Sequence, residues 1–180
     1  MKKNFMLRSL CLLLALVMCF GFAACGGGEG GSDIGGETTG GTDTGKTFSF
    51  VHNNVKITPN SLAAPLITAL GSDYQYQESP SCAFIGMDKM YIYKGFTILT
   101  YPDDKAVDHV LQIILTDDSV ATPEGLMLGH TVEKVTELYG TDYEKSGENF
   151  AYTLGKTRLD IIIKDGEIHS IQYIYTDAAQ

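Results

Sequence analysis

The chain has 180 residues, with 22 Asp and Glu against 13 Lys and Arg, and its formal net charge is −9 at pH 7. Nucleic-acid binding is not expected, because no basic stripe is present to neutralise phosphates. The same net charge argues against attraction to an anionic membrane surface.

The first 24 residues have the three parts of a secretory signal peptide. Lys2, Lys3 and Arg8 make the start basic, an apolar run covers residues 10–20, and small residues precede Cys25. The uncharged apolar stretch is shorter than the about 18 residues that a transmembrane helix needs. We therefore expect residues 1–24 to be removed and no transmembrane helix to remain.

The residues Ala23-Ala24-Cys25 resemble the processing site of a bacterial lipoprotein, in which the cysteine is lipidated on sulfur and becomes the new N-terminus. Phe22 departs from that pattern, which prefers an aliphatic residue, so cleavage by an ordinary signal peptidase after Ala23 or Ala24 remains the alternative. Either route exports the chain. The resemblance implies a lipoprotein held on the extracytoplasmic face of the cell membrane through lipid on Cys25.

A glycine-rich segment follows Cys25. Between residues 26 and 45 most residues are Gly, Ser, Thr, Asp or Glu, and Ile34 is the only large apolar side chain. This composition cannot form a core, and a Gly-rich coil of this length would span about 25 Å. We predict that residues 25–46 are a tether and that residues 47–180 form one globular domain.

Two halves of the expected domain share short motifs. Leu70-Gly71-Ser72-Asp73-Tyr74 corresponds to Tyr139-Gly140-Thr141-Asp142-Tyr143, and the segment at 111–117 corresponds to that at 171–177. In each half a helix-like stretch ends at the glycine, and strand-like segments follow. The predicted strands are 91–93, 96–100 and 111–117 in the first half, and 150–152, 159–163 and 171–177 in the second. Residues 75–90 are expected to form a longer loop.

These patterns predict an α+β fold in which each half has the order helix, strand, strand, strand. The first repeat covers about 47–119 and the second about 120–180. Because three strands and one helix make too thin a layer alone, we expect the repeats to join into one antiparallel sheet with helices packed on one face. Residues 47–57 alternate in polarity around Asn53-Asn54 and predict an additional strand or hairpin.

This order resembles the tandem-repeat fold of the β-lactamase inhibitor protein, and the second half alone resembles the small lipoprotein of the outer-membrane barrel assembly machine. The chain also resembles a group of Gram-positive, clostridial-type lipoproteins. The residues that carry the likeness to the clostridial-type group are Ser81-Cys82-Ala83-Phe84, Gly86, Asp88-Lys89, Tyr91, Tyr93, Gly95-Phe96, Thr100-Tyr101-Pro102 and Glu124-Gly125. That likeness implies a location outside the cytoplasm and no activity.

No residue pattern predicts a catalytic, metal or cofactor site. The histidines His52, His109, His130 and His169 lack the spacing of a zinc site. A segment beginning at Asp142 has the first ligands of a calcium loop, but its twelfth residue is not the required glutamate. The serines near Cys82 have no nucleophile elbow around them. We expect a non-catalytic protein without a metal or cofactor.

Cys82 is the only thiol that remains after the leader is removed and Cys25 is lipidated. An intramolecular disulfide is then impossible. A lone cysteine is usually a small buried hydrophobe, so we expect Cys82 to pack where its loop meets the sheet. A reactive or partner-crosslinking thiol is the alternative.

All ten tyrosines lie between residues 74 and 175. Tyrosine offers a wide contact area with a polar tip, which suits binding surfaces. Tyr91, Tyr93 and Tyr101 are candidates for a binding surface, with core positions as the alternative. Tyr173 and Tyr175 are expected to face the core, because aliphatic residues hold the same register in the first half.

The sequence therefore predicts a membrane-anchored, extracytoplasmic binding or scaffolding module for a protein or cell-envelope component. Its contact surface would be the face of the sheet that no helix covers, marked by aromatic side chains. An enzyme inhibitor that presents residues 75–90 as a protruding loop is the first alternative. A hydrolase with an unrecognised site is the second.

Overall fold

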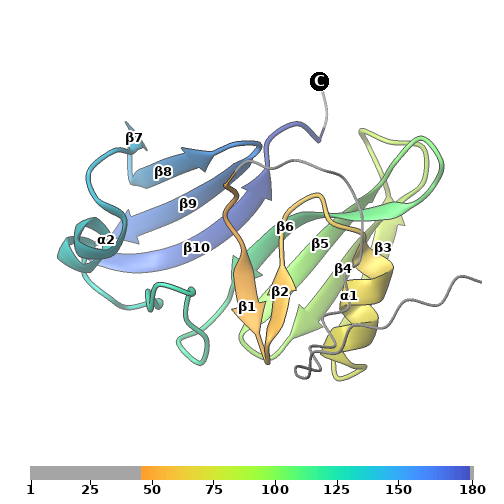
Figure 1. The fold of residues 1–180 in the computed structure, drawn as a ribbon, viewed down its shortest axis with the longest axis horizontal. Helices are drawn as coiled ribbons and strands as arrows, with labels where there is room; N and C mark the ends of the chain where they lie inside the picture. The colour runs from red at the N-terminus through yellow and green to blue at the C-terminus, as the bar shows by residue number, and fades with distance from the viewer. Residues whose placement is uncertain (1–45, 179–180) are drawn as a thin grey trace, which may run out of the picture. The chain divides into compact units, whose positions relative to one another are not determined.

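An antiparallel sheet of eight strands forms most of the part of the chain that the computed structural model describes, residues 46–178 (Figure 1). A small two-stranded sheet and two short helices complete it. The predicted leader, Cys25 and most of the tether lie outside the described residues. Among the described residues, no helix is long and apolar enough to cross a membrane.

The elements follow one another in an order that repeats. They are β1 (Phe50–His52), β2 (Val55–Ile57), α1 (Ala63–Leu70), β3 (Gln75–Pro80), β4 (Met87–Tyr93), β5 (Phe96–Pro102), β6 (Asp108–Leu115), α2 (Val132–Tyr139), β7 (Glu144–Ser146), β8 (Asn149–Leu154), β9 (Thr157–Lys164) and β10 (Glu167–Tyr175). After the β1–β2 hairpin, one helix and four strands thus occur twice. The fold is mostly β rather than an even mixture of helix and sheet.

The eight-stranded sheet has the order β3-β4-β5-β6-β10-β9-β8-β7. The last strands of the two halves, β6 and β10, meet at its centre, where Ile113 pairs with Tyr173 and Leu115 with Ile171. The remaining strands follow outward in reverse chain order on each side. One antiparallel sheet built from both halves was predicted and is confirmed.

The prediction of three strands in each half is wrong, because each half contains four. Residues 75–80, expected in a loop, form the edge strand β3, which pairs with β4 from Gln75 opposite Ile92 to Pro80 opposite Met87. Every residue of β3 is exposed, so the strand lacks the apolar alternation by which strands are recognised. Its proline lies at the strand end, where a missing N–H is tolerated.

The hairpin predicted around Asn53-Asn54 is confirmed. Both asparagines have positive φ angles, 49° and 64°, the backbone conformation that a tight two-residue turn requires and that asparagine tolerates. Phe50 pairs with Ile57 across the hairpin, and both side chains are fully buried. The hairpin therefore contributes to the core in front of the middle of the sheet (Figure 1).

Both helices contribute to the same core as the sheet. The core cluster contains Val135 of α2, with Leu66 of α1 packed against it, together with Phe96, Ile113 and Ile171 of the sheet. In the sheet strands other than the exposed edge strands β3 and β7, residues on one side face this cluster, as the two-residue period of a strand requires. The opposite face of the sheet carries neither of these helices.

Each half also contains the same contact between a strand and the end of the preceding helix. The Tyr93 hydroxyl donates a hydrogen bond to the carbonyl oxygen of Gly71 at 3.4 Å, and that of Tyr152 donates to Gly140 at 2.9 Å. Both glycines end a helix with positive φ angles, 86° and 79°, which glycine adopts without strain. The predicted helix ends at these glycines are confirmed.

Candidate functional site

The side of the sheet that points away from the core cluster is the candidate site, and we call it the open face. The register pairs Thr97 with Ile114, Ile114 with Gln172 and Gln172 with Asp160, which places these four residues on the same side. The side chains between them on each strand belong to the core cluster. The open face thus runs continuously across both halves of the sheet.

Seven aliphatic side chains lie on the open face among its polar residues. They are half-buried, and none of them belongs to the core cluster. The members are Met90, Ile92, Leu99, Leu111, Ile114, Ile162 and Ile174. Sequence analysis missed this surface because consecutive aliphatic residues, as in Ile113-Ile114, are typical of strands buried on both faces. The run itself is the signal that a second apolar face exists.

Polar groups at the centre of the open face are paired with one another. The Gln112 amide donates a hydrogen bond to the side-chain oxygen of Gln172 at 2.6 Å, and the Gln172 amide donates to Ser170 Oγ at 2.9 Å. Farther along, Arg158 donates to both carboxylate oxygens of Asp160 at 2.8 and 2.9 Å. These charges are mutually compensated, so the centre of the open face presents little unpaired polarity.

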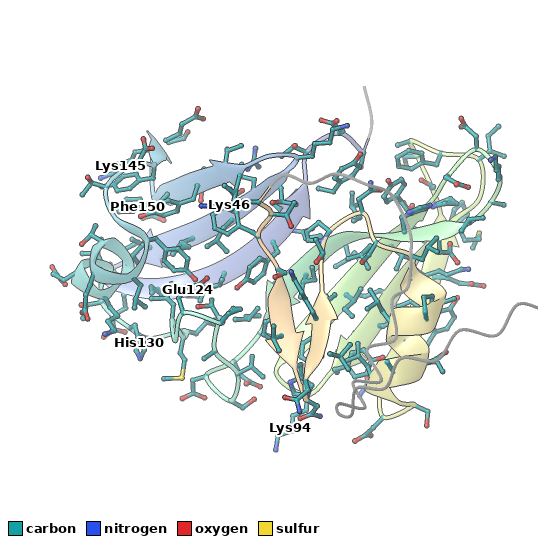
Figure 2. The ribbon with its side chains drawn as sticks, in the orientation of Figure 1. Lys46, Lys94, Glu124, His130, Lys145 and Phe150 are labelled. Carbon is teal, nitrogen blue, oxygen red and sulfur yellow. The ribbon has the colours of Figure 1, made fainter. Side chains whose placement is uncertain are left out.

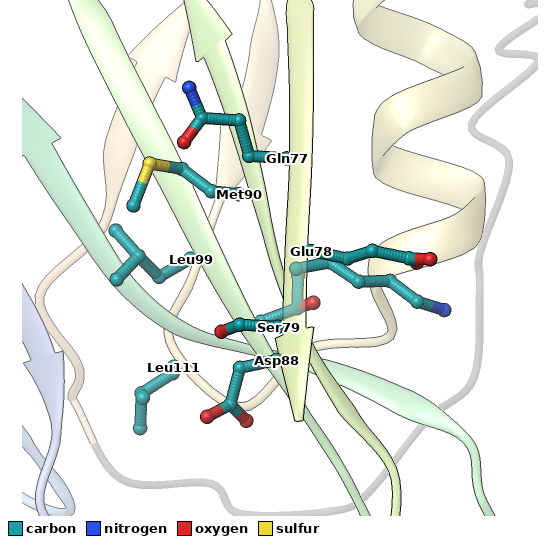
Figure 3. A pocket seen from close by; sticks show the side chains of 9 residues that line it. Gln77, Glu78, Ser79, Asp88, Met90, Leu99 and Leu111 are labelled. Atoms are coloured by element: carbon teal, nitrogen blue, oxygen red, sulfur yellow. The ribbon is translucent and has the colours of Figure 1, made fainter. Parts of the chain in front are cut away.

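A pocket of about 260 Å³ lies on the sheet near the β3 edge, where side chains from four strands converge (Figure 3). It is lined by Gln77, Glu78, Ser79, Asp88, Lys89, Met90, Leu99, Thr100 and Leu111. Figure 3 shows Met90, Leu99, Leu111 and Asp88 on the side of the strands away from α1, whereas Glu78 points toward α1. The pocket is therefore part of the open face.

A β-bulge shapes the pocket. Leu99 pairs with Gln112 and Thr100 with Val110, so Leu111 is an extra residue in β6 without a partner in β5. A bulge bends its strand and redirects the side chain of the extra residue. Here it allows Leu111 to line the pocket beside Leu99.

Two buried polar atoms of the pocket residues have no hydrogen-bond partner within residues 46–178. They are Asp88 Oδ1 and Thr100 Oγ1. Buried polar atoms in folded proteins are nearly always hydrogen-bonded, and one that is not costs about 1–3 kcal/mol. Thr100 pairs with Lys89 and with Val110 of the core cluster, so its side chain lies on the core side of the sheet. Of the two atoms, only Asp88 Oδ1 therefore adds unused hydrogen-bonding capacity to the apolar pocket.

Tyr91, Tyr93 and Tyr101 were candidates for a binding surface, with core positions as the alternative, and the structure shows how far each is buried. Tyr91 and Tyr93 pair with Ile98 and Phe96 and point toward the core side, away from the open face. Tyr93 is 8% exposed and Tyr101 is 7% exposed, and burial raises the pKa of each to about 12. Little of either ring is accessible, and Tyr91 is half-buried. Tyr91 and Tyr93 therefore form no aromatic patch on the open face.

Tyr101 serves the packing of the domain. Its hydroxyl donates a hydrogen bond to Asn60 Oδ1 at 2.7 Å, and its ring lies 4.8 Å from that of Phe84 and 6.2 Å from that of Tyr175, measured between centroids. The prediction that Tyr173 faces the core is confirmed, because it is 1% exposed.

Cys82 is exposed in the loop at 81–86, so the prediction that it is buried is wrong. Ser81 Oγ accepts hydrogen bonds from the backbone N–H groups of Ala83 and Phe84. The turn that results directs Phe84, not Cys82, against the sheet at Tyr101. The protruding segment predicted at 75–90 is reduced to this six-residue connection, in which Ile85 is 97% exposed.

A second polar cluster joins α2 to the connection that precedes it. The Tyr139 hydroxyl lies 2.6 Å from Glu124 Oε2 and 2.8 Å from Thr122 Oγ1; Glu124 is labelled in Figure 2. Burial raises the pKa of Tyr139, which keeps the phenol protonated and unsuited to act as a base at neutral pH. These hydrogen bonds join α2 to the connection that precedes it.

Residues 46–178 contain no group of three or more His, Cys, Asp or Glu side chains that could hold a metal ion.

At the far edge of the sheet, Lys145 Nζ lies 5.1 Å from the centroid of the Phe150 ring, a cation–π contact that joins β7 to β8 (Figure 2).

No protein-family model matches the chain, and searches of curated proteins and of solved structures find no match.

Proposed function

We propose that this chain is a membrane-anchored, extracytoplasmic lipoprotein whose folded domain binds a protein partner through the open face, without catalysis. The observation that carries the proposal is the set of seven half-buried aliphatic side chains on the side of the sheet opposite the core cluster. Contiguous exposed apolar surface on a folded protein marks an interaction site. Lipid on Cys25 and the tether at 25–46 would keep the domain near the membrane while leaving it free to rotate.

A protein fits the open face better than a charged polymer of the cell envelope. The core of a protein interface is depleted of charged residues, and the charges at the centre of the open face, Arg158 and Asp160, already form a bidentate pair. The paired amides of Gln112 and Gln172 likewise leave the centre nearly neutral. An apolar, well-packed partner surface would complement this arrangement.

We also infer that the domain consists of two tandem helix–sheet repeats like those of the β-lactamase inhibitor protein. The mirrored strand order and the doubled contact of a strand tyrosine with a helix-ending glycine support this inference. The aromatic neighbours support it too: Tyr74 packs against Tyr93 at 5.3 Å, and Tyr143 packs against Tyr152 at 5.5 Å.

One observation favours an enzyme inhibitor as the second candidate function. Ile85, at 97% exposure, is an aliphatic side chain that the domain leaves in solvent in the β3–β4 loop. An inhibitor that inserts a loop into a cleft would use such a residue as its anchor.

Photocrosslinking of the full chain in intact cells tests the proposal. A benzophenone amino acid is placed at Ile114 in the centre of the open face, at Ile85 in the loop, or at Glu137 on α2, whose side chain is 65% exposed. We expect a discrete protein adduct from position 114 and none from position 137. An adduct from position 85 alone would favour the inhibitor, and equal adducts from all three positions would refute a specific open-face contact.

A further inference from the structure

The pocket on the open face contains an acidic group that the described part of the chain does not neutralise. Asp88 Oδ1 is buried and has no hydrogen-bond partner within residues 46–178. The neighbouring Lys89 directs its ammonium group to Asp108, with which it forms an ion pair. Glu78, the other acid of the pocket lining, accepts a hydrogen bond from the Tyr76 hydroxyl at 2.5 Å. Asp88 is thus the unused carboxylate of the pocket.

The rest of the pocket is suited to an aliphatic chain. Met90, Leu99 and Leu111 form its apolar part, and Figure 3 shows them on the same side of the strands as Asp88. Its volume of about 260 Å³ lies just below the range of about 300–1,000 Å³ typical of drug-sized ligands. The pocket therefore fits one extended amino-acid side chain better than a drug-sized ligand.

A side chain with an apolar stem and one cationic tip would match both the apolar part of the pocket and the carboxylate of Asp88. Lysine buries its methylene stem along apolar surface and keeps a compact ammonium group with three donors at the end. A pocket of about 260 Å³ favours this compact ammonium group over the broader planar fork of arginine. The excess of 22 acidic over 13 basic residues in the chain also favours a basic partner.

We propose that this pocket receives a lysine side chain of the protein partner, with the stem on Met90, Leu99 and Leu111 and the ammonium group hydrogen-bonded to Asp88. This inference rests on the proposed function, since it specifies what the open face binds. The lysine would provide the specificity of the contact, and the aliphatic remainder of the open face would provide its area.

The test uses small probes that reproduce the lysine side chain. The full chain, labelled with ¹⁵N, is titrated by NMR with n-butylammonium, with n-butanol as the neutral analogue and with n-butylguanidinium as the arginine analogue. We expect butylammonium to shift the amide signals of the pocket residues saturably, and the other two probes to bind at least tenfold more weakly. Equal affinity for butanol or for butylguanidinium would overturn the proposal.

Two variants and a matched control locate the effect. Asp88→Asn keeps the shape of the side chain and removes its charge, and should weaken butylammonium binding at least tenfold. Met90→Ala should weaken all three probes while keeping the preference for butylammonium. Asp118→Asn, an exposed site outside the pocket lining, should bind like the parent chain. Unchanged butylammonium binding in a folded Asp88→Asn variant, verified by dispersed amide signals, would contradict the assignment.

The cellular crosslink separates this inference from the proposed function. With the photocrosslinker at position 114, Asp88→Asn should reduce the adduct at least fivefold, whereas Asp118→Asn should not. An undiminished adduct in Asp88→Asn would overturn the lysine pocket and leave open-face binding intact. The absence of any adduct at position 114, even with butylammonium bound to the pocket, would refute the proposed function and with it the claim that a protein lysine is the ligand.

Discussion

Two adjacent isoleucines at the centre of the sheet provide a direct test of its two faces. Ile113 is fully buried and pairs with Ile98 and Tyr173 on the core side, whereas Ile114 is half-buried on the open face. Replacement of either by alanine removes the same three carbon groups. The two substitutions have the same chemistry and differ only in the face of the sheet that they affect.

The expected magnitudes follow from burial. At Ile113 the loss of three carbons costs about 2.5 kcal/mol of transfer free energy, and an enclosed cavity brings the total to about 3–4 kcal/mol. At Ile114 about half of the surface term is lost and no enclosed cavity forms, so we expect a loss in unfolding free energy of about 1 kcal/mol.

Urea unfolding of the full chain, followed by far-UV circular dichroism, measures both free energies of unfolding. A slope of about 2 kcal/mol/M would give a midpoint shift of about 1.5–2 M for Ile113→Ala and about 0.5 M for Ile114→Ala. Unchanged slopes are the control that the denatured states are comparable. Equal losses for the two variants, or a larger loss for Ile114→Ala, would refute the assignment of the faces.

Four further predictions follow. Tyr152→Phe should lower the unfolding free energy by about 1 kcal/mol, and Tyr93→Phe by less, because their hydroxyl-to-carbonyl distances are 2.9 and 3.4 Å; the reverse order in urea unfolding would contradict this. Iodoacetamide should label Cys82 at the same rate in native buffer and in urea, since the residue is exposed; strong native protection, mapped by mass spectrometry, would argue against that exposure. Cys25→Ala should release the chain from the membrane fraction and abolish labelling by a lipid precursor; unchanged attachment would disprove the anchor. Hydrogen bonds from two backbone N–H groups and from His109 lower the pKa of Asp103. Its ionised form therefore stabilises the β5–β6 turn above the unfolded-state pKa, and this contribution should disappear as the pH falls through the lower folded-state pKa. An unfolding free energy with the same acid dependence in Asp103→Asn would oppose the prediction.

The predictable parts of the fold have local causes. Asn53-Asn54 favours a tight turn, and each of the glycines Gly71 and Gly140 ends a helix with a backbone conformation that other residues resist. Segments rich in β-branched and aromatic residues, such as 96–100 and 159–163, form strands where expected. In each case the information lies within a few neighbouring residues.

The unpredicted parts depend on partners that are distant in the chain. The edge strand β3 has exposed side chains throughout and is a strand only because β4 provides its hydrogen bonds. Cys82 is exposed because the turn at Ser81 directs Phe84 inward instead. Nothing in the sequence assigned a binding role to Asp88, and the role proposed for it follows from the pocket that residues of four strands line.

The sequence by itself established the excess of negative charge and predicted the export signal. It also predicted the hairpin and the approximate positions of most strands. Apart from β10, where Tyr173 was predicted to face the core, only the tertiary structure decided which side of each strand faces the core. The physical reason is the two-residue period of a strand, in which a shift of one residue exchanges the two faces. The bulge at Leu111 makes such a shift within β6, and it places an aliphatic side chain beside the unpaired carboxylate of Asp88 on the face proposed to bind the partner.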